Sequence, residues 1–391
     1  MSNDSAELAL LPNGFEDLLP PHAEIEALSI ATLIGQFTAF GYQRIKPPLL
    51  EFESSLLAPG PGERLAGETF RLMDPVTHRM LGLRSDITPQ IARIAASRLA
   101  KEPRPLRLTY ANDVLRTKGN QMRTVRQFCQ VGCELIGDAS VETDVEICVL
   151  ALLGLKALKF EEITLDLTVP GFVDALVPAG LDKEQQDVLK RAVAQRDRGL
   201  LETLPKKHIS ALAKIMDLST QSRTAEDFFK AFKPVSLPAE IKKDFARLRD
   251  VCTGVERALS ELGLSHVSLT IDLLEQAGLE YLKHLDFTLF STSVHVELGR
   301  GESYDVCFGA NGESETAKGF TLYMDTIRKA CTGAAKKDIV FTAAGVKWSE
   351  IKALQEQGWT IVRGSGNGKP PAECTHIFEK GQVSPLKPSK R

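Results

Sequence analysis

The chain lacks most features that mark secreted, membrane or metal-binding proteins. Its seven cysteines are odd in number and scattered, without a CxxC pair, so we expect reduced thiols. No apolar run approaches the roughly 18 residues that a membrane span needs, and the opening residues, MSNDSAELALLPNG, carry no basic segment followed by an apolar one. The protein is therefore expected in the cytoplasm, with no membrane partner.

The chain also lacks a strong charge of either sign. Its net charge is −3 and its pI is about 6.2, which gives no electrostatic footprint for nucleic acid, although a local basic patch could still be present. No internal repeat is evident, which argues against a solenoid. With 391 residues and 43% hydrophobic content, two or three domains with a sizeable core are expected.

The apolar pattern predicts alternating helices and strands. Pro20 and Pro21 suit the first turn of a helix that runs to about Phe40, where Gly41 can end it. Other predicted elements are two strands around an Asp-Pro turn in 70–84, a helix opening near Ser85 and Asp86, a helix over 141–158, a strand over 161–169 and a helix starting near Lys318.

The composition changes twice along the chain, which predicts three parts. Residues 180–262 have the spacing of charged amphipathic helices and form a predicted helical insertion in a domain of residues 1–179 and 263–332. Residues 333–391 contain short strand patterns, one helix and a basic, Pro-containing tail, which predict a small α/β region. The fold class is therefore α+β.

Residues 107–137, RLTYANDVLRTKGNQMRTVRQFCQVGCELIG, form a predicted hairpin with fixed polar positions. Its returning arm places one set of side chains on an apolar face (Cys129, Val131, Cys133, Leu135) and another on a polar face (Phe128, Gln130, Gly132, Glu134). Alternate strand side chains sit about 6–7 Å apart, so Gln130 and Glu134 could reach opposite ends of a small ligand lying over Gly132. An ordinary half-solvated strand explains the same pattern. Cys129 and Cys133 share a face, but no ligand-spaced partner joins them, so they indicate core packing rather than metal.

This hairpin resembles motif 2 of class II aminoacyl-tRNA synthetases in their histidyl form, with Arg116 at the arginine that contacts the ATP phosphate. Further segments resemble other family motifs, in the family's order: LPNGFEDLLPP, its opening; GYQRIKPPLLEF, motif 1 with Pro48; LRSDITPQIARIA, its LRPEGT; GRGESYD, its GGRYD; and GFTLYMDTI, motif 3. Together they are specific for the histidyl-like branch and cover most of the chain up to Ile327. The resemblance implies an antiparallel sheet flanked by helices.

The same resemblance implies that catalytic positions have been lost. Adenylate formation depends on positioning and on neutralising negative charge, for which the forked guanidinium of arginine is suited. Aligned on Gly319 and Phe320, GFxxGxER has Thr326 at its arginine, and RGLDYY reads AGLEYL, with Ala277 at its arginine. Lys118 and Ser303 replace two further motif residues. Losing one transition-state contact commonly costs about 10²–10³-fold in rate, so normal adenylate chemistry is not expected.

Positions that would bind histidine itself remain. By resemblance, Asp86, Thr88 and Gln130 would accept the ligand's amino group and Glu134 would hold its ring N–H, with Tyr281 and Tyr304 lining the pocket. Leu282 stands where a second tyrosine is expected, and Ala277 no longer receives the carboxylate. The structural alternative is that Asp86 and Thr88 begin a helix while the strand residues complete a polar network.

A synthetase-like body without these arginines, with a C-terminal part shorter than the usual anticodon-binding domain, resembles the regulatory subunits of short-form ATP phosphoribosyltransferase. The resemblance implies no aminoacylation, a dimer formed through the motif 1 region, and a hetero-oligomer with a separate catalytic subunit that this chain activates and that histidine inhibits. Neither a cofactor nor a metal is expected. The alternatives are an active divergent histidyl-tRNA synthetase or other adenylate-forming paralogue, and a regulator that binds uncharged tRNA.

Overall fold

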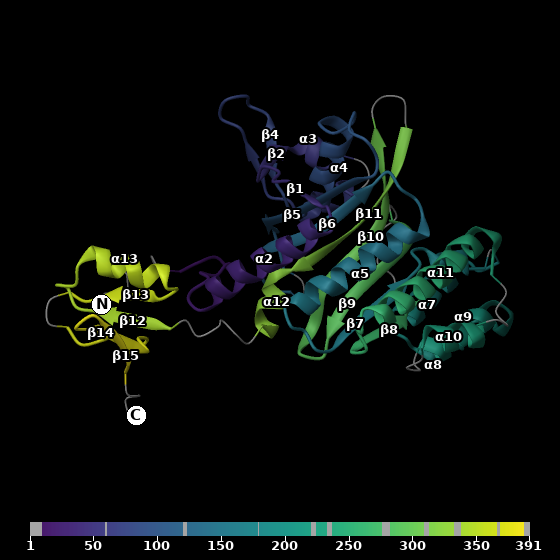
Figure 1. Cartoon of the computed structure of the whole chain (residues 1–391). Coiled ribbons are helices and arrows are strands. Elements are labelled where there is room, and N and C mark those ends of the chain that lie inside the picture. Colours follow the sequence, from purple (N-terminus) through teal and green to yellow (C-terminus); the bar gives the residue numbers. More distant parts are fainter. Residues whose placement is uncertain are drawn as a thin grey trace. The chain divides into compact units, whose positions relative to one another are not determined.

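The computed structural model describes residues 10–58, 61–119, 123–178, 180–219, 224–232, 237–275, 282–308, 313–331, 338–365 and 368–386. The chain divides into two compact units, Met1–Thr332 and Gly333–Arg391, and each is described by itself (Figure 1). In this described part, no helix has the length and apolar character that crossing a membrane requires.

The first unit is built on a mixed, eight-stranded sheet. Its inner pairs are antiparallel, whereas the outermost pair at each edge is parallel. The strands in spatial order are β1 (Gln43–Arg44), β5 (Leu106–Leu115), β6 (Gln127–Ile136), β11 (Glu313–Tyr323), β10 (Val294–Phe308), β9 (Leu282–Ser291), β7 (Ile163–Thr168) and β8 (Val267–Ile271). This sheet with flanking helices confirms the α+β class.

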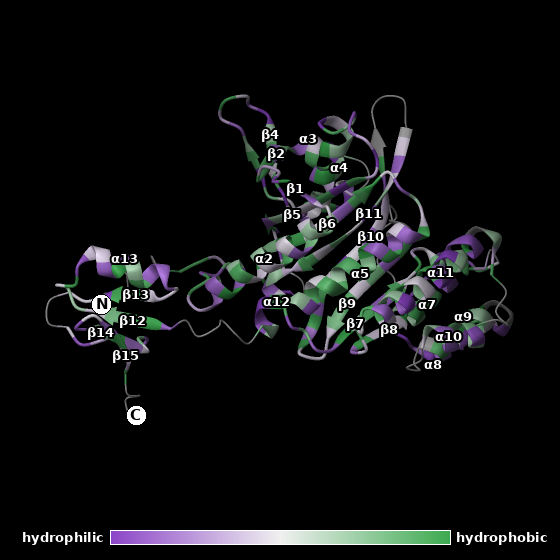
Figure 2. Ribbon diagram, viewed as in Figure 1, coloured by the Kyte–Doolittle hydropathy of each residue, from purple (hydrophilic) through white to green (hydrophobic). Residues whose placement is uncertain are grey.

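The two faces of the sheet belong to different cores. The predicted apolar face of the motif 2 hairpin lies in the larger core, against α2 (His22–Ala39), α5 (Val141–Ala157) and α11 (Ala239–Glu261). Figure 2 shows hydrophobic residues gathered along α5 and the central strands. Phe128 and Ile136 lie in the second core, with Ile87 and Ile91 of the α4 region (Thr88–Ser97 is α4). The two-residue period of β6 is thus confirmed.

Several predicted boundaries are confirmed in the N-terminal third. Helix α2 ends as expected, with Phe40 at its C-cap and Gly41 at φ +83°, a conformation that glycine adopts without strain. The predicted strand pair forms β3 (Arg71–Met73) and β4 (Met80–Leu83), which join β2 (Leu50–Phe52) in a small antiparallel sheet. The helix α3 (Glu53–Leu56) and the 3-10 helix η1 (Glu63–Gly67) lie between these strands in the chain.

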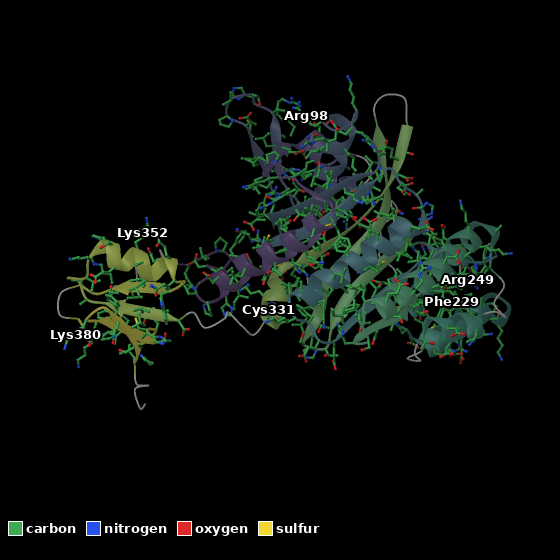
Figure 3. All side chains as sticks on the ribbon, in the orientation of Figure 1. Arg98, Phe229, Arg249, Cys331, Lys352 and Lys380 are labelled. Carbon is green, nitrogen blue, oxygen red and sulfur yellow. The ribbon has the colours of Figure 1, made fainter. Side chains whose placement is uncertain are left out.

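The predicted helical segment 180–262 contains α7 (Lys183–Ala194), α8 (Arg198–Leu201), α9 (Lys206–Ser219), α10 (Ala225–Phe232) and α11, and the short helix α6 (Phe172–Ala175) precedes it. Asp182 and Gln185 form a capping box at the start of α7. Aromatic rings join these helices: Phe232 lies 4.5 Å from Phe245 between centroids, and Phe229, labelled in Figure 3, lies 5.4 Å from it. The helices therefore bury their apolar sides in the larger core.

One prediction about the first unit is wrong. No helix begins near Lys318, because residues Glu313–Tyr323 are the central strand β11 and the helix α12 is Met324–Ala330. Lys318 is 2% exposed and lies 2.6 Å from Asp144, so a charged residue occupies a core position of a strand. The charge hid the two-residue period from the sequence pattern.

The second unit contains the helix and strands that its sequence predicts. Its sheet has the order β13 (Thr360–Arg363), β12 (Ile339–Thr342), β14 (His376–Glu379), β15 (Gln382–Pro385). Helix α13 (Trp348–Glu356) contributes Leu354 to a small core with Val340 and Phe378.

Candidate functional site

A pocket of about 290 Å³ opens in the first unit on the face of the sheet that carries the polar side of β6. Four residues that the sequence singles out line it: Asp86, Thr88, Arg116 and Glu134. Five further charged residues line the pocket, and the sequence did not indicate them as ligand contacts: Arg64, Arg123, Glu297, Arg300 and Glu302. The pocket is thus lined by both acids and bases.

Glu134 is the most deeply buried acid of the pocket, with 1% of its surface exposed. Its Oε1 accepts a hydrogen bond from the Thr88 hydroxyl (3.1 Å), and its Oε2 accepts one from the Tyr304 hydroxyl (3.0 Å). Burial, with a smaller contribution from Glu302, raises the pKa of Glu134 well above its usual range. The carboxyl group is therefore held in a fixed direction by two neutral hydroxyls, ready for a donor or a cation.

Asp86 is oriented by the loop that begins α4. Its Oδ1 accepts a hydrogen bond from the Thr88 N–H (3.0 Å) and its Oδ2 accepts one from the Gln130 amide (3.1 Å). The Gln130 carbonyl accepts from the Ile87 N–H (3.1 Å). Gln130 is fully buried behind the pocket, where it positions Asp86.

The expected ligand position over Gly132 is wrong. A Cβ built on Gly132 would lie 2.6 Å from the Tyr110 hydroxyl and 2.2 Å from the Phe320 carbonyl oxygen, so neighbouring strands fill that space. The Tyr110 hydroxyl itself bonds Thr321, at 2.8 Å. The sequence of one hairpin arm could not show this, because Phe320 and Thr321 come from β11, far along the chain.

Arg116 lies at the edge of the pocket, beside the aromatic ring of Phe128. Its Nε is 3.4 Å from Glu68 Oε2 and 3.4 Å from the Ser85 carbonyl oxygen, and its guanidinium carbon is 5.3 Å from the Phe128 centroid. The Arg116 guanidinium therefore lines the pocket and also pairs with the Glu68 carboxylate.

Arg123 is more enclosed than Arg116. Its guanidinium carbon lies 3.8 Å from the centroid of Tyr323, and its Nε lies 3.4 Å from Asp325 Oδ2. The Nη2 atom is 3.5 Å from the hydroxyl of Thr326 and 3.9 Å from Glu297. The structure thus places Thr326, which is 1% exposed, against an arginine that an aspartate already pairs.

The opposite side of the pocket comes from β10. Arg300 lies 2.8 Å from Glu275 and 3.6 Å from Glu297, and Glu302 follows on the same strand. Glu302 could have been found in the sequence, because it lies two residues before Tyr304 and so on the same strand face. Arg64, from η1, gave no sequence signal.

Two predicted positions, Ala277 and Tyr281, lie outside the described residues, and Leu282 begins β9. Cys129 and Cys133 are buried free thiols in the larger core. Among the residues that the structure describes, no group of three or more His, Cys, Asp or Glu side chains could hold a metal ion.

Comparison with known proteins defines the class of fold. The histidyl-tRNA synthetase family model matches residues 14–327. The solved structure of an ATP phosphoribosyltransferase regulatory subunit/histidyl-tRNA synthetase from Bacillus halodurans superposes with a TM-score of 0.74 at 23% identity, covering 91% of this chain and 92% of that one. Histidyl-tRNA synthetase from Nostoc sp. gives 0.70 at 16% identity, covering 92% and 86%. The chain has the histidyl-tRNA synthetase-like, class II fold.

Sequence relatives narrow the class to a family. The ATP phosphoribosyltransferase regulatory subunit of Rhodospirillum centenum is 41% identical over 98% of this chain and 97% of its own length. That of Paramagnetospirillum magneticum is 39% identical over 98% of each. The chain belongs to the family of ATP phosphoribosyltransferase regulatory subunits.

Proposed function

We propose that this chain is a non-catalytic partner of a short-form ATP phosphoribosyltransferase, that it activates the separate catalytic subunit, and that it supports feedback inhibition by histidine in the first step of histidine biosynthesis. The observation that carries the proposal is the 41% identity to a regulatory subunit over 98% of the chain. The pocket supports it in two ways: it keeps acidic residues suited to an amino-acid ligand, and its Arg123 is paired with the chain's own Asp325.

The arginine pairing in the pocket supports the absence of adenylate chemistry. That reaction needs donors aimed at growing negative charge on phosphate oxygens. Arg123 is instead 3.4 Å from Asp325 and is stacked on Tyr323, and the neighbouring position holds the neutral Thr326. A phosphate arriving there would have to compete with a buried carboxylate for the guanidinium.

The acidic side of the pocket supports histidine as the ligand. Asp86 and Thr88 offer oxygen acceptors to an ammonium group, and Glu134 offers an acceptor to a ring N–H. A carboxylate would lie toward the arginines of the opposite side. An amino acid with a nitrogen-containing ring matches this arrangement of charges.

We also propose that a second copy of this chain covers the small sheet in the motif 1 region. A run of large apolar side chains is exposed there: Leu49, Leu50, Leu72, Met73, Val76 and Met80. Contiguous exposed apolar residues mark interaction surfaces. Sedimentation should show a dimer that Met73→Glu shifts toward monomer, whereas a wild-type monomer at micromolar concentration would contradict this part of the proposal.

The decisive test is phosphoribosyl transfer to ATP by a purified short-form catalytic subunit, with and without this chain. Stimulation that saturates at a fixed ratio of the two proteins is expected. No complex and no stimulation would contradict the proposal. ATP-dependent pyrophosphate exchange with histidine would instead identify an adenylate-forming enzyme, and a salt-dependent titration with tRNA would reveal a tRNA-binding regulator.

A further inference from the structure

Three carboxylates lie in one row across the sheet, on the side where the pocket opens. Glu134 of β6 is directly opposite Gly319 of β11, Gly319 is opposite Glu302 of β10, and Glu302 is opposite Asp286 of β9. Directly opposed residues of antiparallel strands point to the same face, and neighbouring strands lie about 4.8 Å apart. We call Glu134, Glu302 and Asp286 the acid row.

The glycine in the middle of the acid row brings its members together. A Cβ built on Gly319 would lie 2.1 Å from Oε2 of Glu134 and 2.5 Å from its carboxyl carbon. The Glu134 carboxyl group therefore occupies the place of a side chain at position 319, one strand away from Glu302. Like charges placed so closely oppose one another, so the acid row is costly unless something compensates it.

The far end of the acid row has polar atoms without partners. Asp286 is 2% exposed, and its Oδ1 has no hydrogen-bond partner. Thr168 of β7 is directly opposite Asp286, is also 2% exposed, and has an Oγ1 without a partner. Buried polar atoms are nearly always paired, and the exceptions need a reason. A cationic group that enters with a ligand is such a reason.

Arg300, a cation near the acid row, is shared with acids outside it. Burial raises the pKa of Asp286 well above its usual range, Glu302 adds to this, and Arg300 and Arg64 oppose it. Arg300, however, also lies 2.8 Å from Glu275. At the other end, Glu134 is contacted by the neutral hydroxyls of Thr88 and Tyr304, and Asp86 and Glu302 add negative charge there. Arg300 is therefore divided between Glu275 and Asp286, and the Oδ1 atom of Asp286 is still without a hydrogen-bond partner.

We propose that Glu302 and Asp286 extend Glu134 into a subsite for an organic cation, so that the pocket takes L-histidine with its ring as imidazolium. This inference rests on the proposed histidine pocket and adds the charge state and two further residues. A ring with an ordinary pKa of about 6.5 is mostly neutral at pH 7.5, and the acid row would stabilise its charged form. The class of ligand is an amino acid with a cationic side chain.

The experiment is calorimetric titration of the full chain at pH 7.5 with two probes, L-histidine and β-(2-thienyl)-L-alanine, whose ring has similar size and no charge. The variants are Glu302→Gln and Asp286→Asn, which keep the shape of the side chain. The control is Glu315→Gln, a carboxylate on the same face of β11 that pairs with Arg104 at 2.7 Å. Far-UV circular dichroism and thermal melting verify that each variant is folded.

The expected result is that histidine binds at least about tenfold more weakly to either row variant than to wild type or the control, which corresponds to about 1.4 kcal/mol. The thienyl probe should bind to the wild type at least as weakly as histidine binds to the row variants. With ¹⁵N-labelled histidine, the bound ring should show two protonated nitrogens in the wild type. A bound neutral ring, unchanged affinity in both row variants, or no binding of histidine to the folded wild type would overturn the inference.

These outcomes are separable from the proposed function. A chain that stimulates the catalytic subunit but binds histidine independently of Glu302 and Asp286 keeps the proposed function and loses this inference. A chain that binds the imidazolium but neither joins nor stimulates a catalytic subunit loses the proposed function and keeps the cation subsite.

Discussion

Buried charged residues lie on both faces of the sheet around strand β11, and the two faces differ in how these residues are paired. On the face covered by helices, Lys318 lies 2.6 Å from Asp144 and donates to the Thr143 hydroxyl (2.8 Å) and the Ser140 carbonyl (3.0 Å). On the other face, the neighbouring residue Gly319 separates Glu134 from Glu302 in the acid row. One residue along the strand thus separates a paired charge cluster from a row in which Asp286 Oδ1 has no hydrogen-bond partner.

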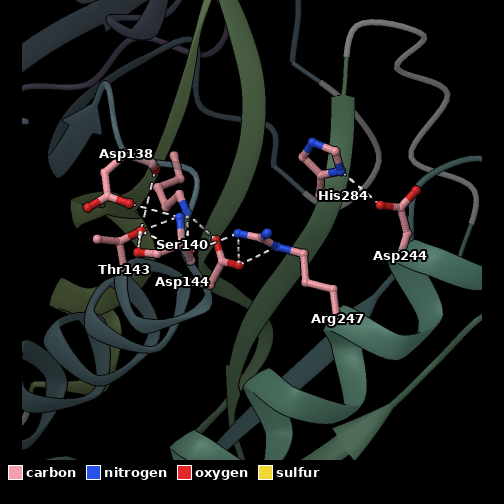
Figure 4. A network of polar contacts seen from close by, with 8 residues as sticks. Asp138, Ser140, Thr143, Asp144, Asp244, Arg247 and His284 are labelled. Carbon is pink, nitrogen blue, oxygen red and sulfur yellow. Dashed lines mark hydrogen bonds and ion pairs between the residues drawn. The ribbon is translucent and has the colours of Figure 1, made fainter.

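The paired charge cluster ties three elements together, as Figure 4 shows. Arg247 of α11 lies 2.5 Å from Asp144 and donates to the Ser140 carbonyl at 2.9 Å, so α11 and α5 are joined to β11. His284 of β9 makes a second link to α11 through Asp244, at 2.8 Å. We call Lys318, Asp144, Arg247, Thr143 and Ser140 the Lys318 network.

The contrast shows how a structural charge cluster differs from a ligand-binding site. In the Lys318 network each cation meets carboxylate or carbonyl oxygens from its own chain, and nothing is left for a ligand to supply. In the acid row a buried oxygen of Asp286 has no partner, beside a pocket of about 290 Å³. Burial alone is common to both, so it is the missing partner that indicates binding.

The largest expected effect breaks the Lys318 network. Asp144→Ala should lower the free energy of unfolding by about 3–5 kcal/mol, because it leaves Lys318 and Arg247 without their shared carboxylate. Urea unfolding measures this. Asp244→Ala, which removes a part-exposed partner of His284, is the control and should cost about 1 kcal/mol or less. Equal losses in the two variants would contradict the structural role of the network.

The next effect acts on the acid row through its spacing. Gly319→Ala should destabilise the chain by about 1–3 kcal/mol and weaken histidine binding, because the new Cβ would displace the Glu134 carboxyl group. Gly345→Ala, where a Cβ meets nothing within 4 Å, is the matched control. Calorimetric titration with histidine that gives the same affinity for both variants would show that Glu134 need not lie over residue 319.

A smaller effect concerns pH. Because the folded pKa of Asp286 is raised, its protonated form stabilises the fold at pH below the ordinary carboxyl pKa of about 3.9, and this contribution is lost as pH rises toward the folded pKa. Asp286→Asn should therefore unfold with less dependence on pH. At pH 8 it should be more stable than wild type by about 1 kcal/mol, while binding histidine less well. Urea unfolding at pH 5, 6.5 and 8 that gives parallel curves for the two proteins would rule out this reading.

The smallest effect tests the end of the row. Thr168→Val removes a buried hydroxyl that has no hydrogen-bond partner and keeps the shape of the side chain. The free energy of unfolding should change by no more than about 0.5 kcal/mol. A loss above about 1 kcal/mol in urea unfolding would mean that this hydroxyl has a partner in solution.

The sequence could predict features that depend on neighbouring residues. The alternation of β6 and the end of α2 at Gly41 are both confirmed. The acid row could not be predicted, because it depends on the register of β9, β10 and β11, which are paired by tertiary structure. The strand around Lys318 was not predicted for the same reason, because the partner that lets this lysine be buried, Asp144, lies far away in the chain.

Regulation of the catalytic subunit through this pocket is the proposal that most needs a direct test. The direct measurement is phosphoribosyl transfer by the reconstituted complex with and without L-histidine, for the wild type and for Glu134→Gln. Each result is expressed as the ratio of the two rates, so that changes in the basal rate cancel. We expect histidine to inhibit the wild-type complex and to have at least about tenfold lower potency on the variant. Equal inhibition of both complexes would contradict the account and would place the regulatory histidine elsewhere.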